Sequence, residues 1–504
     1  MALLFVATSR YGAGIGPDSV VYLSAAENLL RGLGFTALSW TGEMGPMTRF
    51  PPLFPALLSA AGALGLPPEA AARWLNVLVF GANITLAGVL VEKCTASARL
   101  AALTALLMLL SVDMLHVHSM IMTEGIFIFF TLLTVFYSVE HYKNSRPISL
   151  AAAAGAAALA VLTRYSGVAL VAASAAGLVF LGRQPRVRTR LANAAVFSAV
   201  SLLPLLLWIL RNLRVAGNAA DRPMVFHPVA PHKYADAVFI FAGWLAPVNV
   251  SAAAGIIVLL SEAAAVLVLG RLLLQSGALG ARSAPPYHAK VPQLLSFYAL
   301  SYAALVLAAI TFFDAGVQLR IRTLSLIYPV CLIAGVSLGW RWCYPIKNTG
   351  TFKAVAAVLA AVLAGYYLFS AAVWTADVYA NGQRYNGREW RQSELMDTVR
   401  DLPPETLIYT NGPDVIRTLT GRRTRRLPAK AKLQTGLASG AYLSEIAGMQ
   451  EELGKNGGVI VYFDRITTRW YLPSQAELKK QLQLNLLKQT ADGSVYTLAA
   501  AQKY

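Results

Sequence analysis

Residues 354–374 read AVAAVLAAVLAGYYLFSAAVW, an apolar run without a single charged residue. A helix of roughly 20 apolar residues is long enough to cross the ~30 Å hydrocarbon layer of a bilayer. The run is continuous and does not alternate between polar and apolar residues, so it is typical of a transmembrane helix and not of a barrel strand. This stretch predicts a chain that spans a membrane with helices.

Similar runs recur along most of the chain. Of its 504 residues, 56% are hydrophobic and 13% are charged, and the mean hydropathy is +0.54, so apolar sequence exceeds what one soluble core needs. Residues 2–9 are too short to span, and we interpret them as the end of a first helix whose beginning precedes the sequence. With that partial helix we expect roughly eleven spans. The others fall at 74–91, 98–117, 125–139, 149–163, 168–182, 191–210, 250–270, 292–312, 323–340 and 354–374.

The net charge of +18 does not point to a nucleic-acid partner, because much of the excess lies in short loops between the expected spans. These loops alternate along the chain and fall on one side of the membrane, which the positive-inside rule identifies as the cytoplasm. Their basic residues are Lys93, Arg99, Lys143, Arg146, Arg183, Arg186, Arg188, Arg190, Arg271, Arg282, Lys290, Arg341, Lys347 and Lys353. We therefore expect a first loop at 10–73, and the C-terminal tail, on the extracytoplasmic side.

The tail changes character near residue 377. Segments 407–410, 459–463 and 495–498 resemble strands, and segments 442–453 and 475–488 have helical patterns. We expect an all-α polytopic membrane module at 1–376 and a small extracytoplasmic α/β domain at 377–504.

Two carboxylates stand where expected helices begin on the outer side. Asp18 precedes an amphipathic stretch that includes Tyr22, so it is either a helix N-cap or a general base at the membrane boundary. Glu124 opens the run 125–136 and either complements the helix dipole or serves a function. His116 and His118 precede it, but this spacing is weak evidence for a divalent metal.

Arginines also gather on this face. Arg164 interrupts what would otherwise be one apolar hairpin, and a guanidinium cannot face lipid at mid-depth without a partner. Arg211, Arg320 and Arg322 stand at outer span ends, where they either snorkel towards the headgroups or bind phosphate.

The order of several motifs resembles the GT-C superfamily of polyprenyl- or dolichyl-phosphate-sugar-dependent glycosyltransferases, which includes protein mannosyltransferases, aminoarabinose lipid A transferases and lipid A galacturonosyltransferases. The motifs are Gly16-Pro-Asp-Ser-Val-Val-Tyr22, Ala26-Glu-Asn-Leu-Leu-Arg-Gly-Leu-Gly-Phe35, Pro51-Pro-Leu-Phe-Pro55, Ala72-Arg-Trp-Leu-Asn76, Thr123-Glu124, Leu162-Thr-Arg164 and Trp208 to Asn212. The first loop departs from the protein mannosyltransferases, since Asp18 is followed by Ser19 where those enzymes have an Asp-Glu pair.

The resemblance implies a GT-C-like fold with interfacial helices in the first external loop and a polyprenyl-phosphate sugar as donor. The acceptor would be a lipid, a glycan or a protein. Asp18 and Glu124 would be catalytic, with Asp18 as base or as an acceptor-positioning group. From their charge and their place on the outer face, we further expect some of Arg164, Arg211, Arg320 and Arg322 to hold the donor phosphate. Tyr22, Arg49, Pro52 and Tyr165 would line the substrate site. A single displacement would invert the anomeric centre.

Two other classes remain open at the level of sequence. A transporter or flippase for a lipid-linked or anionic substrate would also use intramembrane arginines and carboxylates, but it would typically show two related halves, and no such symmetry is seen. A membrane scaffold whose tail binds partners is the third interpretation.

Overall fold

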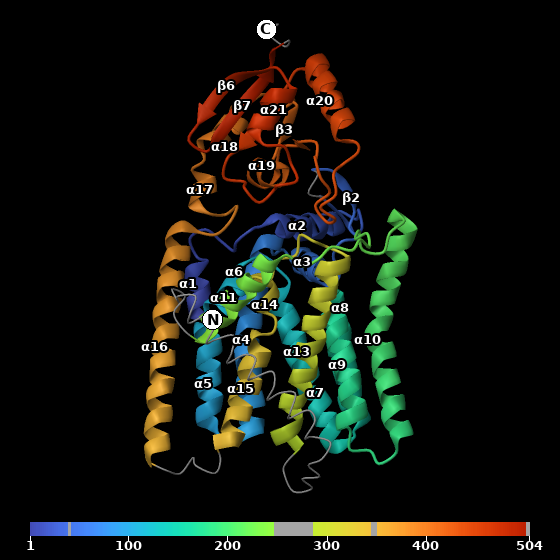
Figure 1. The fold of residues 1–504 in the computed structure, drawn as a ribbon, viewed down its shortest axis with the longest axis vertical. Helices are drawn as coiled ribbons and strands as arrows, with labels where there is room; N and C mark the ends of the chain where they lie inside the picture. Colours follow the sequence, from blue (N-terminus) through green and yellow to red (C-terminus); the bar gives the residue numbers. More distant parts are fainter. Residues whose placement is uncertain (39–41, 246–285, 344–349, 500–504) are drawn as a thin grey trace.

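The computed structural model describes residues 1–38, 42–245, 286–343 and 350–499. Helices stand side by side in a bundle, two further helices lie across one end of it, and a small sheet lies beyond them (Figure 1). The bundle helices are α1 (Ala2–Ala7), α4 (Pro68–Thr95), α5 (Ala98–Leu110), α6 (Val112–Ser119), α7 (Glu124–Asn144), α8 (Pro147–Thr163), α9 (Gly167–Leu181), α10 (Val187–Ala216), α11 (Pro231–Leu245), α13 (Pro286–Phe312), α14 (Ile321–Leu324), α15 (Tyr328–Cys343) and α16 (Gly350–Asn381).

The chain is a multi-pass membrane protein. Five helices in the described part of the chain are long and apolar enough to cross a bilayer, namely α4, α7, α10, α13 and α16. The bent pair α5 and α6 would make a sixth span, and α8 and α9 are apolar but shorter. The predicted span at 250–270 lies outside the described residues. The multispan character is thus confirmed, whereas the count of about eleven stays a prediction.

The helix predicted at 98–117 is broken in two. Ser111 leaves the helical conformation, with φ −65° and ψ 119°, and its side chain accepts a hydrogen bond from the backbone N–H of Met114. It therefore caps a new helix, and α6 turns away from α5 by 54°. After the bend, α6 packs against α4 and α7.

Small side chains let α8 pack closely in the bundle. Ala153, Ala154, Ala157 and Ala160 of this helix are buried, and α8 lies against α7 and α10. Alanine permits close approach of helix backbones in a membrane, where apolar surface alone does not hold helices together.

The first loop forms α2 (Pro17–Leu30), the hairpin β1 (Thr36–Leu38) and β2 (Met44–Pro46), and α3 (Leu53–Ala63). Pro17 is the first residue of α2, a position where its fixed φ suits a helix and its missing N–H costs nothing. Both helices lie across the end of the bundle, between it and the C-terminal sheet (Figure 1).

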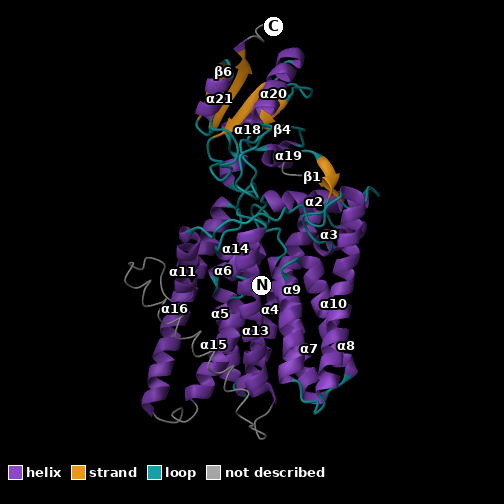
Figure 2. Ribbon diagram, turned by 45° about the vertical axis from the view of Figure 1, so that its right-hand side comes forward, coloured by secondary structure: helices purple, strands orange, loops and turns teal. Residues whose placement is uncertain are grey.

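The C-terminal region carries a mixed five-stranded sheet with the order β4-β3-β5-β7-β6. β3 pairs in parallel with β4 and β5, and β7 pairs antiparallel with β5 and β6. Its strands all lie at one end of the molecule (Figure 2). The elements are α17 (Arg388–Arg391), α18 (Glu394–Asp401), β3 (Ile408–Thr410), α19 (Pro413–Thr420), β4 (Arg425–Arg426), α20 (Tyr442–Asn456), β5 (Val459–Phe463), α21 (Gln475–Gln481), β6 (Leu484–Thr490) and β7 (Gly493–Leu498).

The predicted strands at 407–410, 459–463 and 495–498 are confirmed, but the predicted helix at 475–488 is wrong in its second half. A capping box between Ser474 and Glu477 starts α21, which ends at Gln481. Residues 484–490 then pair with β7 as an edge strand. Cross-strand hydrogen bonds therefore outweigh the local helical pattern.

A buried ion pair ties the C-terminal sheet to the end of α16. Arg469 donates to Asp414 Oδ1 at 2.6 Å, and Tyr385 donates its hydroxyl to Asp414 Oδ2 at 2.7 Å. The Arg469 and Asp414 side chains are only 10% and 3% exposed. Removing one partner of such a pair leaves the other charge buried and uncompensated.

We expect Asp414→Asn to destabilise the C-terminal region by about 3 kcal/mol or more, because Arg469 keeps its buried charge. The measurement is the thermal unfolding midpoint of the purified protein, with proteolysis of the C-terminal region as second readout. Asp397→Asn is the matched control, since its partner Arg400 is exposed, and it should change stability by less than about 0.5 kcal/mol. Equal midpoints for the two variants would contradict this account.

Candidate active site

A cavity of about 800 Å³ lies where the first loop, the ends of the bundle helices and the C-terminal region meet. Asp18 and Tyr22 of α2 face it from one side, and the connection from α13 to α14 faces it from another. Its other charged and polar residues include Arg49, His116, Thr123, Arg164, Tyr165, Arg222, Asp236, Tyr302, Asp314, Gln318, Arg320, Arg322, Thr323 and Arg384.

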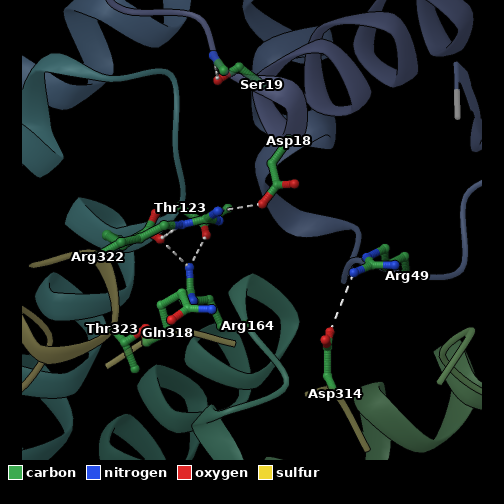
Figure 3. Close-up of polar contacts among 11 residues, drawn as sticks. Asp18, Ser19, Arg49, Thr123, Arg164, Asp314, Gln318, Arg322 and Thr323 are labelled. Carbon is green, nitrogen blue, oxygen red and sulfur yellow. Dashed lines mark hydrogen bonds and ion pairs between the residues drawn. The ribbon is translucent and has the colours of Figure 1, made fainter. Parts of the chain in front are cut away.

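Four charged side chains form a continuous chain at this cavity (Figure 3). Arg322 Nη1 lies 2.6 Å from Asp18 Oδ2, and Arg322 Nε donates to Glu124 Oε1 at 2.6 Å. Arg164 Nη1 donates to the same Glu124 oxygen at 2.7 Å and to the Thr123 hydroxyl at 3.0 Å. Two cations and two anions thus alternate from α2 to the α8–α9 connection.

Glu124 is the most deeply buried member of this chain. Its side chain is 0% exposed, and its second oxygen, Oε2, is buried without a hydrogen-bond partner. It is the first residue of α7, so the helix dipole favours its negative charge, as the sequence suggested. Its larger interaction is with two arginines, since a buried carboxylate needs paired charges.

Asp18 is not the N-cap of α2. Gly16 holds that position, and the Ser19 hydroxyl accepts the hydrogen bond from the Gly16 N–H at 2.9 Å. The N-cap interpretation is therefore wrong: Asp18 lies within the first turn and directs its carboxylate to Arg322. Its side chain is 27% exposed, so it remains accessible from the cavity.

Tyr22 lies one turn after Asp18 and is buried against Phe50 and Phe54. Burial, together with the negative charge of Asp18, raises the pKa of Tyr22, so its phenol stays neutral. Tyr22 forms an uncharged wall of the cavity beside the carboxylate.

The part of the first loop around Thr48 and Arg49 is fixed by contacts with the bundle. The Tyr165 hydroxyl donates to the Thr48 carbonyl at 2.7 Å and accepts from Trp208 Nε1 at 3.2 Å. Arg49 lies 3.4 Å from Asp314, which comes from the opposite side of the cavity. These contacts hold the segment that continues into Phe50 and Pro51 along the cavity wall.

Two residues predicted to bind substrate lie elsewhere. Arg211 donates to the carbonyls of Met47 and Phe35, both at 2.9 Å, and does not line the cavity. Its guanidinium thus binds two backbone carbonyls of the first loop. Pro52 caps α3 and is also absent from the cavity lining, whereas its neighbour Pro51 is part of it.

Arg222, Asp236 and Arg384 are among the cavity residues that the sequence analysis did not single out. Arg222 lies in the connection between α10 and α11, and Asp236 lies in the first half of α11. Arg384 lies in a turn after α16. Burial lowers the pKa of Arg222. The charge of Asp314 raises this pKa, and the charges of Arg49 and Arg164 lower it. The one sequence signal for Arg384 is its position between two Asn-Gly pairs, which are typical of tight turns.

The residues considered for a metal do not form a ligand set. His118 bonds to Asn83 Nδ2 at 3.0 Å and to the Met114 carbonyl at 2.7 Å, and Glu124 is shared between arginines. Within the described ranges, no group of three or more His, Cys, Asp or Glu side chains could hold a metal ion.

Comparisons with known proteins add independent findings. The family model of dolichyl-phosphate-mannose-protein mannosyltransferase matches residues 42–213. No curated protein matches the chain. Because the matched range begins after Asp18, it supports the family without testing that residue.

Two solved structures of one enzyme share this fold over nearly the whole chain. ArnT from Cupriavidus metallidurans in the apo state has a TM-score of 0.61 at 14% identity, covering 99% of this chain and 96% of that chain. The same protein bound to undecaprenyl phosphate has a TM-score of 0.56 at 15% identity, with the same coverage.

A third structure is the archaeal oligosaccharyltransferase AglB from Archaeoglobus fulgidus, in complex with an inhibitory peptide and a dolichol-phosphate. Its TM-score is 0.55 at 13% identity, covering 98% of this chain and 71% of that chain. The family model over residues 42–213, together with the fold over nearly the whole chain, confirms the resemblance seen in the motifs: part of the sequence matches the mannosyltransferase family, and the chain has the fold of ArnT and AglB.

Proposed function

We propose that this chain moves a sugar from a polyprenyl-phosphate donor to a hydroxyl of a lipid, glycan or protein acceptor in the cavity beside Asp18. The observation that carries the proposal is the alternating chain of Asp18, Arg322, Glu124 and Arg164 at that cavity. It presents one accessible carboxylate together with cations, which is the combination that such a transfer needs.

Asp18 is the proposed general base. It takes the proton of the acceptor hydroxyl as that oxygen attacks the anomeric carbon of the sugar. The bond between the anomeric carbon and the phosphate oxygen breaks, and the lipid phosphate leaves with an additional negative charge. A single displacement of this kind inverts the anomeric centre. Arg322 Nη1 lies 2.6 Å from Asp18 Oδ2 and orients the carboxylate.

Glu124 is proposed to act through the arginines. It accepts hydrogen bonds from both Arg164 and Arg322, which line the cavity. These bonds leave the two guanidinium groups little freedom to reorganise. We propose that Arg164, Arg320 and Arg322 stabilise the leaving phosphate, and that Tyr22, Arg49 and Tyr165 line the substrate site. Arg211 is proposed instead to keep the first loop in place.

The proposed orientation puts the cavity on the extracytoplasmic side. The short basic loops at the far end of the bundle support it by the positive-inside rule. In this arrangement α2 and α3 lie at the membrane surface, residues 1–376 form the membrane module with about eleven spans, and residues 377–504 form an extracytoplasmic domain. The partners are then the lipid-linked donor, the acceptor and the surrounding membrane lipids.

We expect Asp18→Asn to lower transfer by roughly 100-fold or more, because general-base catalysis typically contributes that much. The purified protein in lipid is incubated with a panel of polyprenyl-phosphate sugars and acceptor extracts, and released polyprenyl phosphate is measured. Glu27→Gln is the matched control, since Glu27 lies on the same helix but faces a second cavity. Normal turnover of Asp18→Asn would discard the proposed base, and no turnover with any donor in folded wild type would favour a transporter.

We expect Glu124→Gln to destabilise the protein by about 3 kcal/mol or more, because it removes the charge that Arg164 and Arg322 share in a buried position. The thermal unfolding midpoint measures this loss. Asp236→Asn is the control, since its partner Arg320 is 65% exposed and the pair should contribute less than about 1 kcal/mol. A midpoint for Glu124→Gln as high as that of the control would show that the two arginines do not depend on Glu124.

A further inference from the structure

The cavity lining carries more cations than anions. Its arginines are Arg49, Arg164, Arg222, Arg320, Arg322 and Arg384, and its carboxylates are Asp18, Asp236 and Asp314, with Glu124 directly beneath. Four of the arginines form ion pairs with these carboxylates. Arg222 and Arg384 have no carboxylate partner within the part of the chain that the structure describes. The site therefore holds a surplus of positive charge.

We propose that Arg384 binds an oxyanion of a substrate, of the phosphate type, so that the segment leading into the C-terminal domain supplies part of the active site. This inference rests on the proposed transferase function and identifies a binding residue for it. A free guanidinium is suited to such a group because it donates two parallel hydrogen bonds to neighbouring oxygens.

The backbone around Arg384 is fixed to the first loop. Arg384 pairs with Ile15 in a parallel bridge, the Tyr385 N–H donates to the Ile15 carbonyl at 3.0 Å, and Asn386 Nδ2 donates to the Ala13 carbonyl at 2.8 Å. Ile15 lies three residues before Asp18. The position of Arg384 is therefore coupled to the strand-like segment that leads into α2.

The same turn also contacts the segment that leads into Glu124. Gln383 Oε1 accepts from the Ser119 hydroxyl at 2.6 Å, and Gln383 Nε2 lies 3.4 Å from His116 Nδ1. The backbone carbonyl of Ser119 accepts a hydrogen bond from the Gly14 N–H at 2.9 Å. Arg384 thus enters the cavity at the point where the segments carrying both carboxylates are held together.

The conformation of Arg384 is unusual. Its φ is 52°, a left-handed conformation that costs energy for a residue with a β-carbon. In the described ranges, three other non-glycine residues share it: Ala96 and Ser145 end helices, where it is ordinary, and Asp221 directly precedes Arg222. Of the two unpaired arginines of the cavity, Arg384 is itself left-handed, and Arg222 directly follows a left-handed residue. Such strain typically persists where a side chain must be held towards a ligand.

The charges of the reaction support this role. Arg164 and Arg322 are already balanced by Glu124 and Asp18, whereas the phosphate that leaves in the transfer gains one negative charge. An unpaired arginine can offset that charge without giving up an existing ion pair. The oxyanion belongs either to the lipid phosphate of the donor or to an anionic group of the acceptor.

The test compares wild type with Arg384→Asn and Arg384→Lys, as full-length proteins in phosphatidylcholine nanodiscs. Asparagine tolerates the left-handed backbone but lacks the charge, and lysine keeps the charge. Arg388→Gln is the matched control, because Arg388 lies in the same segment and contacts Gln392 instead of the cavity. The readouts are the shift in unfolding midpoint with inorganic phosphate against chloride at equal ionic strength, and the Kd of undecaprenyl phosphate from tryptophan fluorescence.

We expect Arg384→Asn to lose the phosphate-induced shift and to bind undecaprenyl phosphate about 10-fold more weakly, the usual effect of losing a charge-assisted hydrogen bond. Arg384→Lys should retain part of the phosphate-induced shift and part of the affinity for undecaprenyl phosphate. Arg388→Gln should equal wild type in both measurements. Loss of the phosphate effect alone, with unchanged undecaprenyl phosphate binding, would assign Arg384 to an anionic acceptor.

Two outcomes separate this inference from the proposed function. If wild type responds to inorganic phosphate through Arg384 but does not bind undecaprenyl phosphate, the anion site stands and the proposed donor fails. If Arg384→Asn equals wild type in both measurements, or wild type responds to neither ligand, the inference is overturned.

Discussion

The structure of the site depends on a carboxylate that is buried completely and shared by two arginines. Glu124 can stay charged there only because Arg164 and Arg322 approach it from two different helix connections. Arg164 reaches Glu124 from the end of α8, where it is the C-cap residue. Arg322 reaches Glu124 from α14, a separate short helix that follows the α13–α14 connection. Arg322 then extends the interaction to Asp18 in the first loop. The breaks between helices are therefore part of the site and not defects in the bundle.

The first loop needs further support, because Phe35 and residues 47–51 lie outside its strands and helices and their carbonyls must find donors. Arg211, Asn212 and Tyr165 supply them by binding the carbonyls of Phe35, Met47 and Thr48. An arginine at a span end thus has a third use besides snorkelling and phosphate binding. Sequence could not distinguish these uses, since the acceptors lie more than 160 residues away from Arg211 along the chain.

Local sequence patterns predicted most of the helices and strands whose formation depends on nearby residues. Apolar runs predicted the bundle helices, Asp18 was placed at the start of the helix that became α2, and strand-like segments predicted β3, β5 and β7. The errors lie where distant contacts decide. Residues 484–490 become a strand because β7 pairs with them, and α6 turns away from α5 at Ser111, whose capping role is hidden inside an apolar run. At the site, Glu124 and Arg322 were predicted from charges at span ends, Arg164 from its interruption of an apolar hairpin, and Asp18 from its place before an amphipathic stretch. Arg222 and Arg384 lie in connections that have no periodicity to interpret.

The C-terminal region is bound into the site and not merely attached to the last helix. Asn386 and Tyr385 donate to carbonyls of Ala13 and Ile15, and Arg391 donates to the Tyr11 carbonyl at 3.2 Å. On the other side of the cavity, the Ala315 N–H donates to the Gln434 carbonyl at 2.8 Å, and Leu433 lines the cavity. Without these donors and acceptors, the backbone next to Asp18 and Asp314 would lose the partners that fix it. The C-terminal region therefore helps to hold the backbone near Asp18 and the backbone near Asp314 on two sides of the cavity.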